Sequence, residues 1–346
     1  MIPTKGYAAK QAKGALEPFS FERKAPGPKE VLIEIAYCGV CHSDLHKVNN
    51  DWGGSAYPLV PGHEIVGIVN KVGKDVKRFK PGDNAGVGCF IDSCRNCEAC
   101  KDHEEQYCAS ATWTYGAKLA DGLRTYGGYS ERIVVNEDFV LTIAKDANLA
   151  STAPLLCAGI TTYSPLKHWN VGKGQNVGIV GLGGLGHMGL KLAKSFGAKV
   201  VAFTHSPKKK EDALRLGADE VIVTSDVASM EKHKGSFDFI LDTVSAPHDL
   251  NQMLGMLRRN GHYVIVGVPS DPHAVHAFSL IEGRHSLSGS LIGGIKQTQE
   301  MLDYCAKKGI VSDVEVIPMQ DINKAYERML KGDVRYRFVI DMKSLK

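Results

Sequence analysis

A glycine-rich loop constrains the fold of this chain more than any other stretch. The loop follows an apolar run that is predicted as a strand, and it precedes a segment with helical periodicity. It matches the fingerprint G-x-G-x-x-G, whose glycines allow a tight turn, close approach of a pyrophosphate, and close packing of helix on strand. A purely structural glycine turn is the alternative, but the strand-loop-helix-strand context favours a dinucleotide site. The predicted loop residues are Gly181, Gly183, Gly184, Leu185 and Gly186.

The end of the next predicted strand indicates which dinucleotide binds. NAD sites usually place Asp or Glu there to accept hydrogen bonds from the ribose. After Phe203 the chain instead reads Thr-His-Ser-Pro-Lys-Lys-Lys, and the first carboxylate is Glu211. Hydroxyls and lysines suit a 2′-phosphate. Ser206 before Pro207 also fits a helix N-cap followed by solvated lysines, and both interpretations can hold together. We therefore expect NADP rather than NAD.

Four cysteines form a compact cluster in the first half of the chain. Cys94, Cys97, Cys100 and Cys108 have the spacing C-x2-C-x2-C-x7-C. Four thiolates this close can surround one zinc ion in a closed tetrahedral site, whose role is structural because no position is left for substrate. Two disulfides are disfavoured in a reducing compartment. An iron–sulfur cluster is not excluded by spacing alone. We predict zinc.

A second concentration of chemical groups lies at residues 41–46, Cys-His-Ser-Asp-Leu-His. The segment holds a thiol, a hydroxyl, a carboxylate and two imidazoles, which suits a metal site with a titratable histidine beside it. Cys41, His63 and Cys157 would supply two thiolates and one imidazole. They lie too far apart in sequence for spacing alone to join them, and a lone His63 or Cys157 is more often a packed core residue than a ligand.

The chain as a whole is long enough for two domains, with 346 residues. It is β-rich to about residue 150, and strands and helices then alternate as in parallel βαβ units, so the predicted class is α/β. The net charge of +4 is scattered, which argues against nucleic-acid binding. No secretory signal and no apolar stretch of about 18 residues is found. We expect a cytoplasmic protein with reduced thiols.

The sequence also predicts individual strands and helices in the second half of the chain. Expected strands are 176–180, 199–203, 220–223, 237–241, 263–266 and 286–291, and expected helices are 190–196, 207–216 and 297–308.

With these motifs together, the chain resembles the zinc-dependent medium-chain alcohol dehydrogenases. It is most similar to their cinnamyl alcohol dehydrogenase branch, which includes bacterial broad-specificity aldehyde reductases. The resemblance runs nearly end to end and includes the four-cysteine cluster, the segments 154–163 and 334–341, and the glycine loop. The family's signature G-H-E-x2-G-x5-G-x2-V is matched by Gly62, His63, Glu64, Gly67, Gly73 and Val76.

This resemblance implies a GroES-like β-rich catalytic domain at 1–157 and 296–346, with a structural-zinc lobe at about 89–113. A Rossmann domain would occupy 158–295. The catalytic zinc would bind Cys41, His63 and Cys157, giving two zinc ions per subunit. Glu64 corresponds to the family's alternate metal ligand, and Asp44 to the carboxylate that orients the ligating histidine.

The same resemblance implies the remaining roles. Ser43 would pass a proton from the substrate oxygen through the cofactor ribose to His46, for which an exposed helix histidine is the alternative reading. Thr204, Ser206 and Lys209 would hold the 2′-phosphate. Further cofactor residues by family position are Thr161, Val266 and Arg337. Pocket residues by family position are Trp52, Cys89, Trp113 and Ile292, any of which could instead be ordinary core.

The expected function is NADPH-dependent, reversible reduction of an aldehyde to a primary alcohol, with zinc as Lewis acid. The two indoles would suit an aromatic, cinnamaldehyde-like or long apolar substrate. Three alternatives remain: an NAD-dependent alcohol or polyol dehydrogenase, a non-catalytic NADPH-binding structural protein, and a metal-storage or sensor protein. The resemblance also suggests a homodimer joined through its Rossmann sheets.

Overall fold

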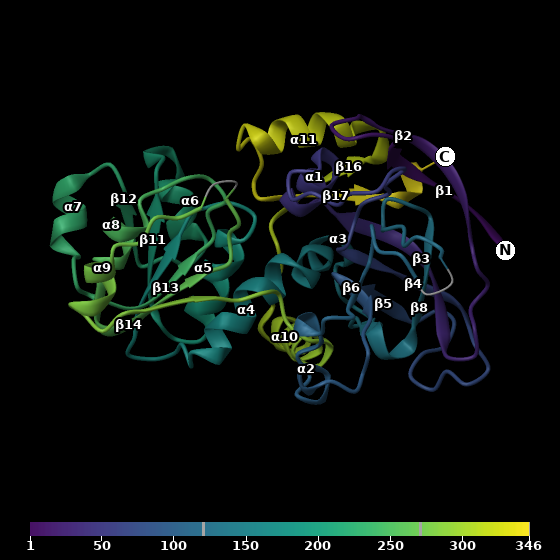
Figure 1. The fold of residues 1–346 in the computed structure, drawn as a ribbon, viewed down its shortest axis with the longest axis horizontal. Helices are drawn as coiled ribbons and strands as arrows, with labels where there is room; N and C mark the ends of the chain where they lie inside the picture. The colour runs from purple at the N-terminus through teal and green to yellow at the C-terminus, as the bar shows by residue number, and fades with distance from the viewer. Residues whose placement is uncertain (120–121, 270–271, 346) are drawn as a thin grey trace. The chain divides into compact units, whose positions relative to one another are not determined.

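The chain folds into two compact units in the computed structural model. One unit contains both chain ends, and the other is a single continuous stretch (Figure 1). The sequence-based boundary of the second domain, 158–295, ends three residues after the observed one. The first unit comprises Met1–Cys157 and Gly293–Lys346, and the second comprises Ala158–Ile292. The structure describes residues 1–119, 122–269 and 272–345.

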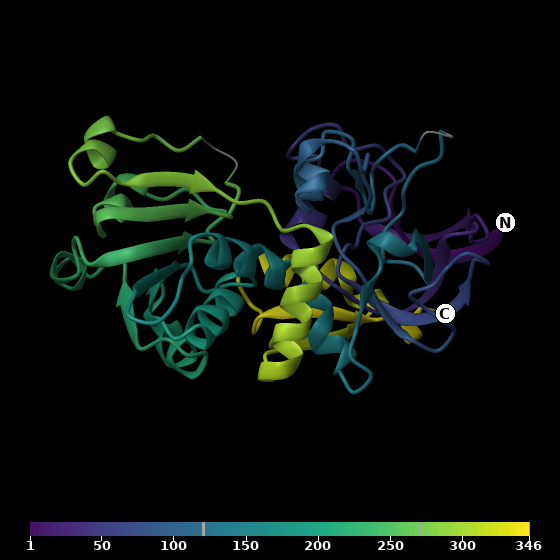
Figure 2. The ribbon, with the colours of Figure 1, turned by 90° about the horizontal axis from the view of Figure 1, so that it is seen from below.

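The second unit is built on a six-stranded, fully parallel sheet with the order β12-β11-β10-β13-β14-β15. Figure 2 shows its green strands pointing the same way. The chain builds outward from β10 in one direction and then from β13 in the other, so a switch point lies between these two strands. Ligands of such sheets bind outside the carboxyl ends of the strands at that point. The strands are β10 (Asn176–Val180), β11 (Lys199–Thr204), β12 (Glu220–Val223), β13 (Phe237–Asp242), β14 (Leu257–Ile265) and β15 (Ser286–Gly289).

The sequence predicted two helices in this unit, and both begin differently in the structure, while the other four helices named below were not predicted. The helix expected at 190–196 begins four residues earlier, at Gly186, because the glycine loop opens directly into it. The helix expected at 207–216 starts as a 3-10 turn at Pro207–Lys209 and becomes α-helical at Lys210. The helices are α4 (Ala158–His168), α5 (Gly186–Ser195), α6 (Lys210–Arg215), α7 (Val227–Lys232), α8 (Leu250–Leu254) and α9 (Ala277–Ile281).

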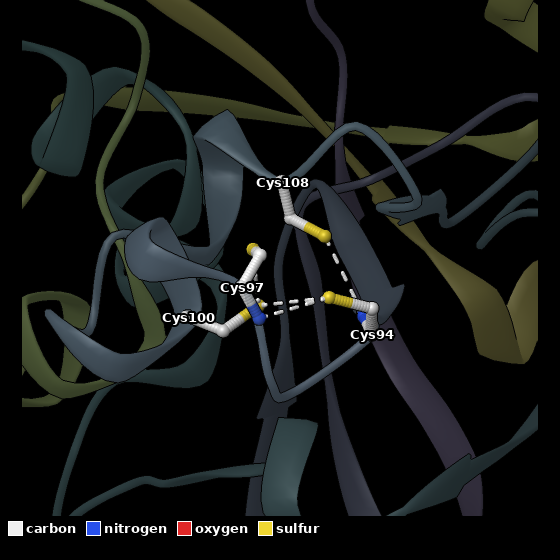
Figure 3. A group of neighbouring side chains, drawn as sticks. All are labelled: Cys94, Cys97, Cys100 and Cys108. Carbon is white, nitrogen blue, oxygen red and sulfur yellow. Dashed lines mark hydrogen bonds between the residues drawn. The ribbon is translucent and has the colours of Figure 1, made fainter.

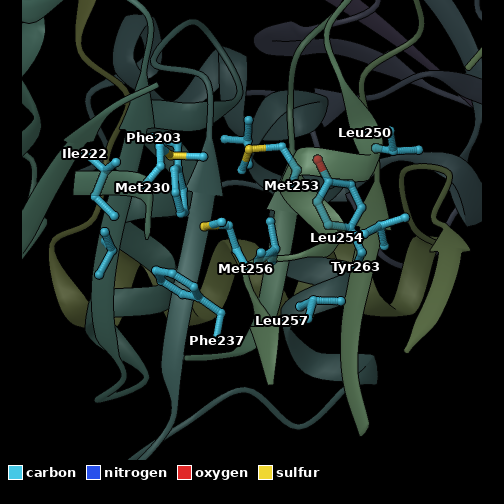
Figure 4. Close-up of a cluster of buried hydrophobic side chains, with 13 residues drawn as sticks. Phe203, Ile222, Met230, Phe237, Leu250, Met253, Leu254, Met256, Leu257 and Tyr263 are labelled. Atoms are coloured by element: carbon cyan, nitrogen blue, oxygen red, sulfur yellow. The ribbon is translucent and has the colours of Figure 1, made fainter. Parts of the chain in front are cut away.

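An apolar core on one face of this sheet holds the strand ends in place. Phe203 and Phe237 pack at 5.1 Å between ring centroids, and methionines from α7 and α8, Met230 and Met253, cover them (Figure 4). Each large apolar side chain buried this completely contributes about 1.5–3 kcal/mol. The core therefore holds the central strands of the sheet against α7 and α8.

The first unit is organised around a mixed sheet with the order β16-β17-β3-β4-β5-β9, and β8 also pairs with β3. The C-terminal strand β17 lies antiparallel beside β3, so residues some 300 positions apart become neighbours (Figure 1). Two further pairs, β1–β2 and β6–β7, are antiparallel. The strands are β1 (Ile2–Ala9), β2 (Leu16–Arg23), β3 (Glu30–Gly39), β4 (Ile65–Val72), β5 (Asn84–Val87), β6 (Phe90–Asp92), β7 (Thr112–Trp113), β8 (Arg132–Asn136), β9 (Leu141–Thr142), β16 (Val314–Pro318) and β17 (Arg337–Asp341).

Short helices connect these strands. In the part of the chain that the structure describes, no helix has both the length and the apolarity needed to cross a membrane. The helices of the first unit are α1 (His42–Asn49), α2 (Glu98–Lys101), α3 (Leu149–Thr152), α10 (Ile295–Lys308) and α11 (Ile322–Leu330).

Candidate active site and metal centres

A buried carboxylate at the start of α1 organises the first candidate site. Asp44 accepts a hydrogen bond from the backbone N–H of Cys41 at 3.0 Å, which caps the helix and fixes the thiol at its first turn. The same carboxylate accepts from the N–H of Gly62 and from Nδ1 of His63, each at 3.0 Å. Tyr129 adds its hydroxyl at 3.3 Å. One side chain therefore ties α1 to the segment that carries His63.

The position of His63 depends on the glycine before it. Gly62 has φ +102°, a backbone conformation that other residues rarely adopt. A Cβ atom there would also lie 2.6 Å from the Tyr129 ring. Only glycine satisfies both conditions, so the order Gly-His-Glu has a local physical cause.

Four potential ligands then meet, namely Cys41, His63, Glu64 and Cys157. All are buried, and their ligand atoms lie within 4.8 Å of one another. The Sγ atoms of Cys41 and Cys157 are 4.0 Å apart. Two thiolates at about 2.3 Å from one tetrahedral zinc lie about 3.8 Å apart. Because His63 uses Nδ1 to bond Asp44, its Nε2 remains for a metal. This donor set fits zinc.

The protonation of the two thiols also fits a cation. A hydrogen bond with Cys157 lowers the pKa of Cys41 well below its ordinary value, and Arg337 and His63 lower it further. The same hydrogen bond raises the pKa of Cys157. The pair therefore favours one thiolate and one thiol. A divalent cation would replace the shared proton and hold both as thiolates.

Glu64 has a partner that the sequence does not reveal. Its carboxylate forms an ion pair with Arg337 from β17, and both side chains are almost fully buried. Burial raises the pKa of Glu64 to about 7, although Arg337 opposes this. The second carboxylate oxygen, Oε2, is buried without a hydrogen-bond partner among the described residues, which leaves it free to approach a metal. Arg337, predicted as a cofactor residue, is engaged here with Glu64.

The predicted proton-transfer residues lie on one face of α1. Ser43 Oγ is 3.7 Å from Cys41 Sγ. His46 follows three positions later, and its Nδ1 lies 2.8 Å from Oδ2 of Asp51. The Trp52 ring lies beside the His46 ring, with centroids 4.9 Å apart and planes tilted by 31°. Asp51 was missed at the sequence level, since a carboxylate five residues beyond a histidine has no motif of its own.

The predicted pocket residues differ in burial and in the residues that they contact. Trp52 and Trp113 are 43% and 40% exposed, and Trp113 packs edge-on against Phe90. Cys89 contacts the Leu156 carbonyl and the Cys157 thiol. Ile292 is buried in the second unit. Their role as a substrate pocket stays a prediction.

The four-cysteine cluster forms a separate centre (Figure 3). The Sγ atoms of Cys94 and Cys100 are 3.9 Å apart and those of Cys97 and Cys100 are 3.5 Å apart. These distances bracket the separation expected around one zinc and exceed the roughly 2.05 Å of a disulfide. Backbone N–H groups of Asn96 and Cys97 point at Cys94 and lower its pKa to about 6. All four sulfurs fit one closed site.

The glycine loop in the second unit has the geometry that dinucleotides require. Gly181 has φ +89° and makes the turn out of β10. A Cβ atom on Gly183 would meet nothing within 4 Å, so this backbone is open to a ligand. A Cβ atom on Gly186 would lie 2.0 Å from the Gly181 carbonyl, which only glycine avoids. The loop ends at the first turn of α5, where backbone N–H groups suit a pyrophosphate.

One of the residues at the end of β11 and just after it reaches this loop. Lys209 donates from Nζ to the Leu182 carbonyl at 2.9 Å, so its ammonium group reaches the glycine loop. Thr204 Oγ1 accepts from the Ser206 N–H at 3.2 Å. Ser206 occupies the N-cap before Pro207, yet its side chain makes no capping hydrogen bond. Thr161 is buried in α4, and the Val266 N–H bonds the Asp242 carbonyl at the end of β13.

Comparison with known proteins agrees with this architecture. Residues 27–145 match the model of the alcohol dehydrogenase GroES-like domain, and residues 184–307 match that of the zinc-binding dehydrogenases. The chain is 56% identical to the aldehyde reductase YahK of Escherichia coli strain K12 over 344 residues, which is 99% of each protein.

Two solved structures superpose along almost the whole chain. A cinnamyl alcohol dehydrogenase from Sorghum bicolor, SbCAD4, has a TM-score of 0.97 at 44% identity and 99% coverage of both chains. The CAD of Helicobacter pylori, solved in complex with NADP(H), has a TM-score of 0.95 at 43% identity, covering 100% of this chain and 99% of the other.

Proposed function

The chain belongs to the zinc-dependent medium-chain alcohol dehydrogenase family, and we propose that it interconverts aldehydes and primary alcohols with NADP(H). The observation that carries this proposal is the buried set of Cys41, His63 and Cys157 around one point, in a chain that also holds a complete dinucleotide loop. A non-catalytic nucleotide-binding protein would have no need for such a three-ligand set. Three protein ligands are typical of catalytic zinc because they leave a fourth position for substrate or water.

Separate residues of the chain are proposed to bind the catalytic zinc ion, to orient its ligands and to bind the structural zinc ion. Cys41, His63 and Cys157 would hold the zinc ion, and Asp44 keeps His63 in the tautomer that presents Nε2. Bound zinc supplies Lewis acidity toward a carbonyl oxygen, and bound NADPH supplies hydride. The Cys94 cluster would hold the second, structural zinc.

Proton delivery is assigned to α1. Ser43 lies beside the metal ligand Cys41, so its hydroxyl is suited to hydrogen-bond the substrate oxygen. His46 is the titratable group on the same helix, and Asp51 holds its Nδ1 side. This leaves Nε2 of His46 to exchange protons.

NADP is proposed over NAD because of three groups at and just after the end of β11. Ser206 has a hydroxyl not used for capping, Thr204 adds a second hydroxyl, and Lys209 brings a cation to the glycine loop. These groups neutralise and bond a 2′-phosphate. Aromatic aldehydes are the proposed substrates, since Trp52 beside His46 offers a flat apolar face.

The test is the rate of NADPH oxidation with cinnamaldehyde, compared with the same assay using NADH. We expect turnover with NADPH, little with NADH, and little oxidation of mannitol with NAD⁺. Faster turnover with NADH would contradict the cofactor choice, and a preference for mannitol would indicate the polyol alternative. Absence of turnover with any pair, in protein containing two zinc ions per chain, would contradict the enzymatic function itself.

Substitutions test whether the proposed zinc ligands are required for turnover. Cys41→Ser and His63→Ala should abolish turnover while NADPH binding, followed by fluorescence, is retained. Cys305→Ser is the matched control, because Cys305 is buried against Met301 in neither metal group. Near-native turnover in Cys41→Ser would contradict the proposed zinc site.

A homodimer and a cytoplasmic location are part of this proposal. Edge strand β15 has no further partner strand among the described residues, and nearby Phe278 and Ile281 in α9 are each 68% exposed. Nine cysteines without a disulfide fit a reducing compartment. Light scattering should give twice the chain mass, and Phe278→Glu should shift it toward the monomer. A monomeric wild type would contradict the dimer.

A further inference from the structure

A third group of metal-binding side chains lies in the second unit, apart from the zinc ligands assigned above. Asp242 is the last residue of β13, and His248 follows it before α8. His273 lies in the segment between β14 and α9. One ligand atom from each of the three lies within 4.8 Å of the others. We propose that these residues form a third zinc site, in which one carboxylate and two imidazoles bind the ion.

The pairing of Asp242 with His248 presents two acceptors to each other. Nδ1 of His248 lies 3.0 Å from the Ala246 carbonyl, so it carries a hydrogen and donates to that oxygen. In the neutral ring, Nε2 then has a lone pair, and it lies 2.9 Å from Oδ2 of Asp242. A carboxylate oxygen and this ring nitrogen at 2.9 Å must share a cation, which is either a proton on Nε2, making the ring an imidazolium, or a metal ion.

The second imidazole, that of His273, indicates that this cation can be a metal. Nε2 of His273 is buried and has no hydrogen-bond partner among the residues that the structure describes. Its ring packs edge-on to His248, with centroids 5.0 Å apart and planes at 74°. A proton shared between Asp242 and His248 would leave His273 unsatisfied, whereas a metal ion would use all three side chains.

The surroundings hold the ligands in place. The Asp242 side chain is fully buried and also accepts from the Val244 N–H and the Tyr263 hydroxyl, each at 3.0 Å. Asn251 in α8 donates to the Ala274 carbonyl at 2.9 Å, which ties the neighbours of His273 to the helix after His248. Carboxylate and histidine ligands supported by such contacts are typical of metal sites.

The distances require only a small adjustment. Nitrogen and oxygen ligands at about 2.0–2.1 Å from a tetrahedral zinc lie about 3.3 Å apart. The observed 2.9 Å between Asp242 and His248 would open by a few tenths of an ångström, and His273 would move closer. Three protein ligands leave the fourth position to water. The ion would fasten the segment after β13, whose Val244 packs on the glycine loop at Gly181, to the segment before α9.

Zinc counting tests this site in the intact protein. Purified protein is dialysed against buffers of increasing free Zn²⁺, and bound zinc per chain is measured by atomic emission. We expect the wild type to bind a third equivalent, and His273→Ala and His248→Gln to bind it at least about 100-fold more weakly, because losing a ligand costs more than losing a supporting contact. Co²⁺ in the third site should add d–d absorption without a thiolate charge-transfer band.

His276→Ala is the matched control. His276 lies three residues from His273 on the same segment and is exposed, and its backbone N–H, not its ring, bonds Asn251. This variant should keep the third equivalent. A wild type that saturates at two zinc ions overturns the proposal, and so does a folded His273→Ala that binds three as tightly as the wild type. Melting curves at low zinc confirm that the variants are folded.

Discussion

Nδ1 of His63 lies 3.0 Å from Oδ1 of Asp44, and both side chains are buried. The contact joins two segments of the first unit that spacing could not connect. Although burial lowers the pKa of His63, the Asp44 carboxylate outweighs it and raises that pKa well above its usual value. Such a histidine binds a metal through Nε2 while its other nitrogen stays fixed.

Asp44→Asn tests this relationship. The amide offers one acceptor oxygen where the carboxylate now accepts from Cys41, Gly62, His63 and Tyr129. We expect zinc affinity at the Cys41 site to fall about 10–100-fold. Retention of zinc against a chelator measures this, with exposed Asp146→Asn as the control. Equal zinc retention in Asp44→Asn and in wild type would contradict the role of Asp44.

Cys97→Ser should affect stability more than chemistry. The four sulfurs near Cys97 hold a loop of the first unit together, and their metal contributes folding free energy. Loss of a structural metal is among the few single changes with an exceptionally large effect on stability. We therefore expect Tm to fall by about 10 °C or more. Thermal melting followed by circular dichroism measures it, together with the loss of one zinc per chain.

The control for this prediction is again a buried cysteine outside both groups. Cys305→Ser removes a thiol from α10 without touching a metal ligand. Its Tm should fall much less, and its zinc content should stay unchanged. A Cys97→Ser protein with native Tm and no activity would mean that the cluster serves chemistry instead.

Lys209→Met tests the cofactor choice. Lys209 reaches the glycine loop, whereas Lys208 is exposed and points its charge to solvent. A charge-assisted hydrogen bond is worth about 1.5–3 kcal/mol, so kcat/KM for NADPH should fall about 10–100-fold. The value for NADH should change little, because NADH lacks the 2′-phosphate. Lys208→Met is the control, and an equal loss with both cofactors would contradict a phosphate contact.

The strands of the second unit were largely predictable from local sequence, whereas the helices α4, α7, α8 and α9 were not predicted. Short apolar runs between turn signals locate strands well, and the ranges 176–180 and 220–223 coincide with β10 and β12. The start of α5 was not predicted because glycines at 186 and 189 have low helix propensity. Tertiary packing overrides that propensity, because only glycine fits at position 186, where a Cβ atom would lie 2.0 Å from the Gly181 carbonyl.

The two candidate zinc sites of the first unit differ in how well the sequence alone could predict them. The cysteines at 94–108 lie within one loop, so their spacing already defines a single centre. Cys41, His63 and Cys157 are brought together by pairing of distant strands, which no local pattern encodes, and only the family resemblance joined them. The ion pair of Arg337 with Glu64 has the same cause, because β17 pairs with β3 across nearly the whole chain.

Asp51→Asn tests how His46 is held. Oδ2 of Asp51 lies 2.8 Å from Nδ1 of His46, and Trp52 covers the ring. An asparagine amide is an uncharged and weaker acceptor, and it can turn its NH2 group toward Nδ1, so the ring should be held less firmly. General acid–base catalysis contributes about 10²–10⁴-fold, so misorienting its donor should lower kcat by about 10-fold or more. KM and NADPH affinity should stay near the wild-type values.

A role of Asp51 in orienting His46 is distinguished from a purely structural role by whether kcat or the melting temperature changes. A purely structural Asp51 would leave kcat intact while the melting temperature falls. Asp51→Glu, which keeps the carboxylate, should recover part of the rate, and a solvent isotope effect on kcat should increase in Asp51→Asn as proton transfer becomes limiting. Asp75→Asn is a control, since Asp75 is an exposed carboxylate outside both metal groups. Unchanged kcat in Asp51→Asn would show that His46 does not depend on Asp51 for its orientation.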